Sequence, residues 1–139
     1  MRTSSNGGSS YDSGSSDYRW TQFYTEDEQT DVKRKFDYDE SFWQLTPDVV
    51  SVHVNVGSDS GEDGVSGYVD IWGPHLVKNT IMSADIQFIT ATPASPAQVA
   101  KCVSSCVRNS SADVDAWTVL FSSGNIESGT INVLGLNNS

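Results

Sequence analysis

The sequence predicts an α+β fold: a mostly antiparallel β-sheet or small β-sandwich of about five to six strands, one amphipathic helix and an extended N-terminal arm. Three observations lead to this prediction. Several segments alternate apolar and polar residues with period two, one segment carries the signals of a helix start, and the chain has too few helices for a parallel sheet. The length of 139 residues suits one folded domain.

Residues 1–17 form the predicted arm, because they consist almost entirely of Ser, Gly, Asn and Asp. Such a segment buries too little apolar surface to offset an ordering entropy of about 1–2 kcal/mol per residue. We therefore expect it to be flexible alone in solution. A neighbouring chain is expected to order it more readily than its own domain does.

Residues 18–45 are predicted to be an aromatic and charged extended segment, with a short extended stretch at 19–24 and an extended or one-turn helical stretch at 36–45. The spacing of the rings fits no single strand or helix face. Large rings on an irregular segment need apolar cover, which a partner chain can supply. The residues predicted to bind a partner are Tyr11, Tyr18, Trp20, Phe23, Tyr24, Phe36 and Tyr38.

Residues 46–139 are predicted to form a single β-rich domain. Alternation predicts strands at 50–56, 68–72 and 80–90, and a closing hairpin at 117–121 and 130–134. In the second of these strands, Val69 and Ile71 lie on one face and Tyr68, Asp70 and Trp72 on the other. The first two strands and the Gly- and Asp-rich loop 57–67 read as a hairpin with a long tip.

The helix is predicted at about 96–108. Ser95 suits the N-cap, Pro96 the first helical position, and Gln98 completes a capping box. An apolar stripe at helical spacing follows, formed by Val99, Cys102, Val103, Cys106 and Val107. The two cysteines on this stripe are expected to be buried thiols that act as small hydrophobic side chains.

No metal or other cofactor is predicted. Within the loop 57–67, Asp59 and Asp63 are weak candidates for calcium ligands, because Gly61 stands where an EF-hand loop needs a ligand. A solvated hairpin tip is the favoured reading of this loop.

No catalytic constellation is visible either. The sequence has no G-x-S-x-G motif, no P-loop and no dinucleotide-binding glycine pattern. Asp70, Trp72 and His75 form the one compact polar and aromatic group in an ordered region, and a surface turn is the default reading for it. We therefore expect a protein that is not an enzyme.

Charge and hydropathy exclude some classes of binding partner. A formal charge of -10 disfavours nucleic acid and anionic membranes, both of which need clustered positive charge. No apolar run approaches the roughly 20 residues that span a bilayer, and no signal peptide is expected after Met1.

These observations predict a structural or assembly subunit that docks on neighbouring chains through its arm and aromatic segment, in a homo- or hetero-oligomer. A virion component (capsid, tail or decoration protein) is the setting that this combination suggests by analogy. Two alternatives stay open: a calcium- or carbohydrate-binding module that uses the 57–67 loop and exposed rings, and an enzyme whose site is too divergent to read.

Overall fold

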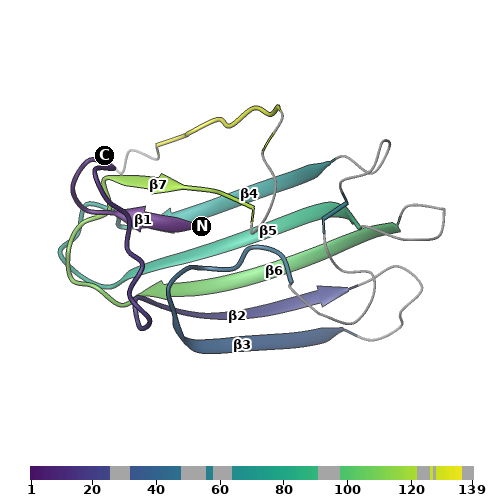
Figure 1. The fold of residues 1–139 in the computed structure, drawn as a ribbon, viewed down its shortest axis with the longest axis horizontal. Coiled ribbons are helices and arrows are strands. Elements are labelled where there is room, and N and C mark those ends of the chain that lie inside the picture. Colours follow the sequence, from purple (N-terminus) through teal and green to yellow (C-terminus); the bar gives the residue numbers. More distant parts are fainter. Residues whose placement is uncertain are drawn as a thin grey trace.

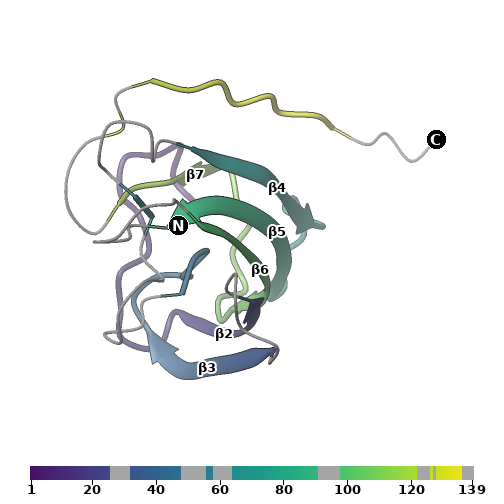
Figure 2. The same ribbon diagram turned by 90° about the vertical axis from the view of Figure 1, so that its right-hand side faces the viewer.

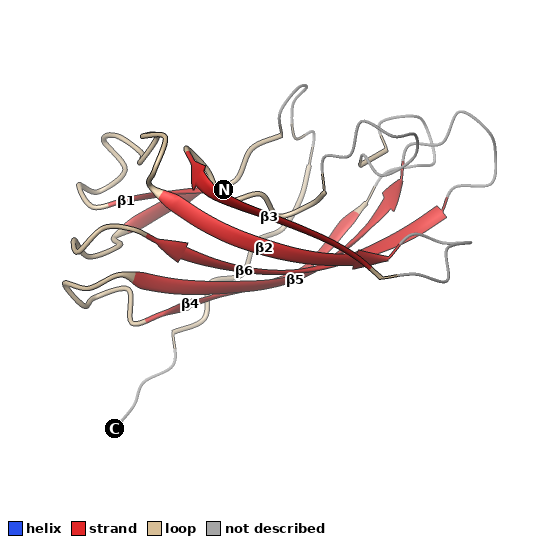
Figure 3. Cartoon of the chain, turned by 90° about the horizontal axis from the view of Figure 1, so that it is seen from below, coloured by secondary structure: helices blue, strands red, loops and turns tan. Residues whose placement is uncertain are grey.

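The computed structural model describes residues 1–25, 32–47, 56–57, 64–90, 98–121, 126 and 128–135. Within these residues the chain is all-β, with seven strands in two antiparallel sheets that form a sandwich-like arrangement (Figures 1 and 3). The strands are β1 (Arg2–Ser4), β2 (Tyr18–Thr25), β3 (Lys33–Glu40), β4 (Val65–Trp72), β5 (Thr80–Thr90), β6 (Gln98–Arg108) and β7 (Ala116–Thr118).

The larger sheet has five strands in the order β3-β2-β6-β5-β4. Its central hairpin, β5–β6, is the longest: the two strands pair from Thr80 opposite Arg108 to Thr90 opposite Gln98. β2 pairs with β6 on one side and with β3 on the other. The two N-terminal strands β2 and β3 therefore lie beside β6, on the side opposite β5 and β4. In Figure 2 the sheet is an arc, with the N-terminus and β7 on its concave side.

The predicted α+β class is wrong, because the segment predicted as a helix is strand β6 in its described part. Its buried residues alternate with period two, from Ala100 through Cys102, Ser104 and Cys106 to Arg108. Two of these residues, Cys102 and Cys106, also belong to the predicted helical stripe, so their burial alone does not distinguish a strand from a helix. β2 and β5 supply backbone hydrogen-bond partners along both edges of the segment, and this pairing favours the strand. The proposed caps Ser95 and Pro96 lie outside the described residues.

The other predicted strands have different outcomes. The strands at 68–72 and 80–90 are confirmed within β4 and β5. The one at 117–121 is shorter than predicted and overlaps β7, while residues 130–134 are exposed and belong to no strand of the described chain. Of the strand at 50–56, all but Val56 lies outside the described residues. Val56 forms a single antiparallel bridge with Thr90.

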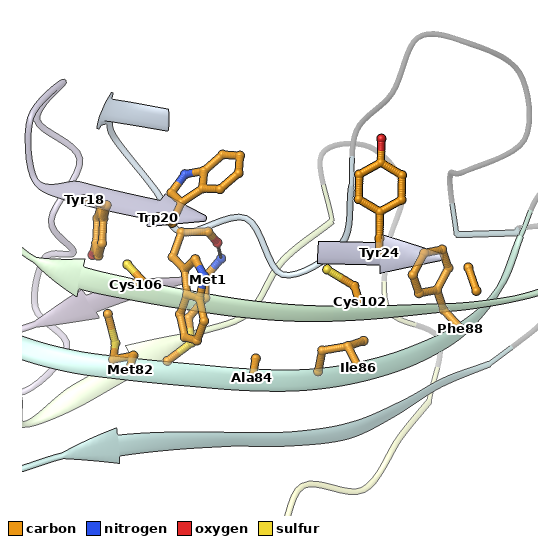
Figure 4. Packing of buried hydrophobic residues seen from close by; sticks show 12 residues of the cluster. Met1, Tyr18, Trp20, Tyr24, Met82, Ala84, Ile86, Phe88, Cys102 and Cys106 are labelled. Carbon is orange, nitrogen blue, oxygen red and sulfur yellow. Dashed lines mark hydrogen bonds between the residues drawn. The ribbon is translucent and has the colours of Figure 1, made fainter. Parts of the chain in front are cut away.

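The core lies on the concave side of the large sheet, and we call this side the inner face. Alternate residues of β2, β5 and β6 point into it together with Met1 (Figure 4), and Trp43 belongs to the same buried cluster. The indole Nε1 of Trp43 donates a hydrogen bond of 2.7 Å to Ser104 Oγ, which anchors the 41–47 segment to β6. Gln22 is fully buried beside it and donates to the carbonyl oxygen of Gln44.

The N-terminal arm docks on its own domain. β1 pairs with β7, and Thr3 and Ser4 are buried. The amino group of Met1 donates a hydrogen bond of 2.7 Å to the carbonyl oxygen of Trp43. A single chain therefore supplies contacts that hold the start of the arm. The division into an arm, an aromatic segment and a domain remains a prediction.

Candidate functional site

The convex side of the large sheet is a candidate binding surface, which we call the outer face. Alternation directs every second residue of each strand toward it, on the side opposite the core. One row of cross-strand neighbours crosses all five strands, from β3 to β4. It consists of Arg34, Phe23, Val103, Asp85 and Tyr68.

Large apolar side chains are exposed on this face. Phe23 and Val103 face each other across β2 and β6, and each is nearly half exposed. Tyr68 and Trp72 on β4 are each 60% exposed. The other exposed apolar residues of this face are Phe36, Ile81 and Val99. So many apolar side chains on one sheet face are typical of a surface that binds another molecule.

Charges of both signs lie among these apolar side chains. Lys101 Nζ and Asp85 Oδ2 form an ion pair of 2.8 Å, and the carboxylate of Asp85 raises the pKa of the lysine. The guanidinium of Arg34 lies 5.5 Å from the ring centroid of Phe36, within cation–π range. Aromatic residues and arginine around an apolar centre resemble the composition of protein interfaces.

The two edge strands of the sheet differ in their charge. Of the eight residues of β3, Lys33–Glu40, six are charged, which discourages pairing with a further strand. β4 has one charged residue, Asp70, and no proline. Among the described residues, β4 pairs with β5 alone. Its free edge therefore lacks the charge protection that β3 has.

The seven residues predicted to bind a partner differ in their burial. Tyr18, Trp20 and Tyr24 lie in the core of their own chain, and Tyr11 is half-buried. Phe23 and Phe36 are exposed on the outer face. Tyr38 lies in β3, and its side chain is outside the described part of the structure. Docking through rings therefore rests on Phe23 and Phe36 rather than on all seven residues.

Because 98–108 was predicted to be a helix, two further residues of the outer face were not predicted to be exposed. Val99 and Val103 belong to this surface only when 98–108 is a strand, because a helical stripe assigns them to the core. For the exposed rings of β4 the sequence did contain a signal, because alternation placed Tyr68 and Trp72 on the same face of the strand. Sequence alternation did not reveal which face of β4 was covered.

The predicted metal and catalytic groups find no further support. Asp59 and Asp63 lie outside the described residues. Within the described ranges, no three His, Cys, Asp or Glu side chains gather as a metal site would require. Asp70, Trp72 and His75 are all exposed.

Both cysteines are confirmed as buried free thiols. Burial raises the pKa of each thiol to about 12, so neither is a reactive nucleophile near neutral pH. They lie on the inner face of β6 in contact with the core, as small apolar side chains do.

A shallow depression of about 230 Å³ lies where β4, β5 and β6 meet at one end of the sheet. The side chains around it carry no titratable group; the lining residues are Gly64, Val65, Ser66, Gln87, Phe88, Ile89 and Val99. It offers apolar contact without acid, base or nucleophile.

A buried polar network ties the arm to β6. Arg108 Nε lies 2.6 Å from Asp12 Oδ2, and the same carboxylate oxygen accepts a hydrogen bond of 2.9 Å from Thr3 Oγ1. The backbone N–H of Thr3 donates to the hydroxyl oxygen of Tyr18 at 2.8 Å, and burial raises the pKa of that hydroxyl. Every residue of this network binds another residue of the same chain, so we assign it a structural role.

The chain has no helix, in the part that the structure describes, that would be long and apolar enough to cross a bilayer. No family model, curated protein or solved structure matches this sequence or fold.

Proposed function

We propose that this protein is a non-enzymatic assembly subunit that docks on other protein chains through the outer face of its five-stranded sheet. The observation that supports this most is the apolar centre of that face, where Phe23 packs across from Val103 and both are exposed. Exposed clusters of this kind are stabilised when a partner covers them, because burial of apolar surface contributes about 25 cal/mol per Å².

The proposal changes one part of the sequence-based hypothesis. The arm supplies contacts within its own chain, so the docking role passes from the arm to the outer face. A homo- or hetero-oligomer stays the expected state. A capsid, tail or decoration component of a virion remains the suggested setting, and it is supported by analogy of architecture alone.

The experiment compares the chain with the double variant Phe23→Ser/Val103→Ser. Sedimentation velocity over a concentration series measures association, and circular dichroism checks that the variant is folded. We expect the variant to stay folded and to associate at least tenfold more weakly. Val77→Ser, the same kind of change at an apolar residue that is 74% exposed and lies outside the sheet, is the matched control and should associate as the unmodified chain does. A folded double variant that associates normally would contradict the proposal.

A second candidate function is carbohydrate binding, which one observation favours. Tyr68 and Trp72 expose their rings on the same face of β4, with the carboxylate of Asp70 between them. Aromatic faces stack on the apolar faces of sugar rings while a carboxylate accepts hydrogen bonds from sugar hydroxyls. Retardation of the chain in gels that contain a polysaccharide would support this function if Trp72→Ala abolished it and Phe23→Ser did not.

A further inference from the structure

Residues 128–135 form an exposed apolar segment near the C-terminal end of the described chain. Ile131, Val133 and Leu134 are 66%, 74% and 88% exposed. Within the described chain, no hydrogen bond or ion pair involves a residue of this segment. Figure 2 shows it, in yellow, running outside β4 and away from the concave side of the sheet.

The segment has the pattern of a strand. Ile131 and Val133 alternate with Thr130, Asn132 and Leu134, so an extended backbone directs the first two to one side and the other three to the opposite side. It contains β-branched residues, no proline and no charged side chain. Isolated from a sheet, a strand leaves its backbone N–H and C=O groups without the partners that a ladder provides.

The free edge of β4 is long enough to pair with the alternating residues 130–134 of the segment. β4 has 8 residues, Val65–Trp72. At about 3.3 Å per residue, β4 is roughly 26 Å long and residues 130–134 span roughly 17 Å. The other edge of the sheet, β3, is charged along most of its length and is the poorer acceptor.

The inner side of β4 is incompletely covered. Val69 and Ile71 pack against the core but stay partly exposed, and Val65 is nearly half exposed. A strand added beside β4 would place one of its two sides next to these residues. If that side carries Ile131 and Val133, the added strand extends the core, and Asn132 lies on the outer face with Asp70.

We infer that residues 128–135 of one copy add as a sixth strand to the free edge of β4 in a second copy. The inference rests on the proposed assembly function and names its partner, a second copy of this chain. Within the described residues of one copy neither the segment nor the β4 edge is paired, and a second copy supplies each of them with the partner it lacks. The segment carries no charge, and therefore its approach to a copy of charge -10 is not opposed by its own side chains.

The mode of association follows from symmetry. Two copies that exchange segments reciprocally close as a dimer, whereas a segment given in one direction only produces a ring or an open filament. Both arrangements use the same pairing, which is the strand addition seen in β-augmentation.

The first test uses the full chain with Ile131→Asp/Val133→Asp. We expect this variant to associate at least tenfold more weakly than the unmodified chain in sedimentation velocity, because two charges would enter the core side of the new strand. Val77→Asp is the control, since it adds a charge at an exposed apolar residue outside the segment and outside the strands of the sheet, and it should associate almost normally. Equal association of the unmodified chain and the double variant would overturn the inference.

The second test locates the pairing. One copy carries Asp70→Cys and another, with a size tag, carries Asn132→Cys; a short bifunctional maleimide then links them. Cys102 and Cys106 should not react in the folded protein, because both are buried with a pKa of about 12. A cross-link between unlike copies supports the inference. No product from the mixture, together with closure inside a monomer that carries both changes, shows that the segment binds its own β4 and overturns it.

The two proposals fail in different ways. If the outer-face variant loses association and the segment variant keeps it, the proposed function stands and strand addition is wrong. If the segment variant alone loses association, strand addition stands and the outer face is not the docking surface. A chain that stays monomeric at every concentration overturns strand addition and excludes a homo-oligomer as the assembled state.

Discussion

Breaking the buried ion pair between Asp12 and Arg108 should destabilise the fold in an asymmetric way. The side chain of Arg108 is 1% exposed and that of Asp12 is 24% exposed. Asp12→Ala leaves a buried guanidinium without its carboxylate, which costs about 3–5 kcal/mol of unfolding free energy. Arg108→Met leaves a carboxylate that water can reach, so we expect a smaller cost of about 2–3 kcal/mol.

The double variant Asp12→Ala/Arg108→Met completes a double-mutant cycle, which measures the interaction free energy between the two side chains. Without either charge, the buried site holds an apolar methionine, and we expect a total cost of about 3 kcal/mol, well below the sum of the two single changes. The guanidinium also donates to the carbonyl oxygen of Ala112 at 2.6 Å, and the loss of this bond is common to both variants that contain Met.

Urea unfolding followed by tryptophan fluorescence measures these free energies, because Trp20 and Trp43 are buried and change environment on unfolding. Asp113→Ala, which removes an exposed carboxylate near the same turn, is the control and should change stability by less than about 0.5 kcal/mol. Strict additivity of the two single variants, or an Asp12→Ala cost below about 1 kcal/mol, would refute the buried pair.

Three more predictions follow from individual contacts. Gly67→Ala should lower the free energy of unfolding in urea by more than about 2 kcal/mol, because a Cβ at this position would collide with the backbone carbonyl of Asp85 and lie 2.9 Å from Ile86 Cα. An unchanged free energy of unfolding would show that the strands can separate at this point. Burial lowers the pKa of the Met1 amino group to about 6 from 8.0. The unfolded chain therefore binds more protons between pH 6 and pH 8, and the free energy of unfolding should rise by about 2 kcal/mol over this range. N-terminal acetylation should remove this rise, and a rise that survives acetylation belongs to another group. Cys102 and Cys106 should resist a thiol reagent at pH 8 in the folded chain and react in urea, whereas rapid reaction without urea would mean that β6 is not buried.

Alternation in the sequence was enough to find β4 and β5 and to separate the two faces of β4. In β4, Val69 and Ile71 lie toward the core and Tyr68 and Trp72 away from it, as the period of two requires. The burial of both cysteines also followed from residue type, since a strand and a helix each place positions 102 and 106 on one face.

The conformation of β6 was decided only by the tertiary structure. The apolar residues of 98–108 follow a helical stripe, and the capping signal at Gln98 also favoured the helix. The buried face of the strand instead includes the polar residues Ser104 and Arg108. The hydrogen-bonding edges of β2 and β5 lie on either side of the segment, and those strands come from positions about 80 residues before it and directly before it. The pairing with β2 is long-range and leaves no signature in the local sequence.

The docking of the N-terminal arm on its own domain also depends on residues that are distant in the sequence. Its composition predicts too little apolar surface to fold alone, and the residues that hold it, Arg108 and Trp43, lie far along the chain. The sequence by itself determined which residues alternate, which are charged and which segments are weakly hydrophobic. The tertiary structure decided which face is covered and which strand edge stays free, because both depend on contacts between distant segments that no local pattern records.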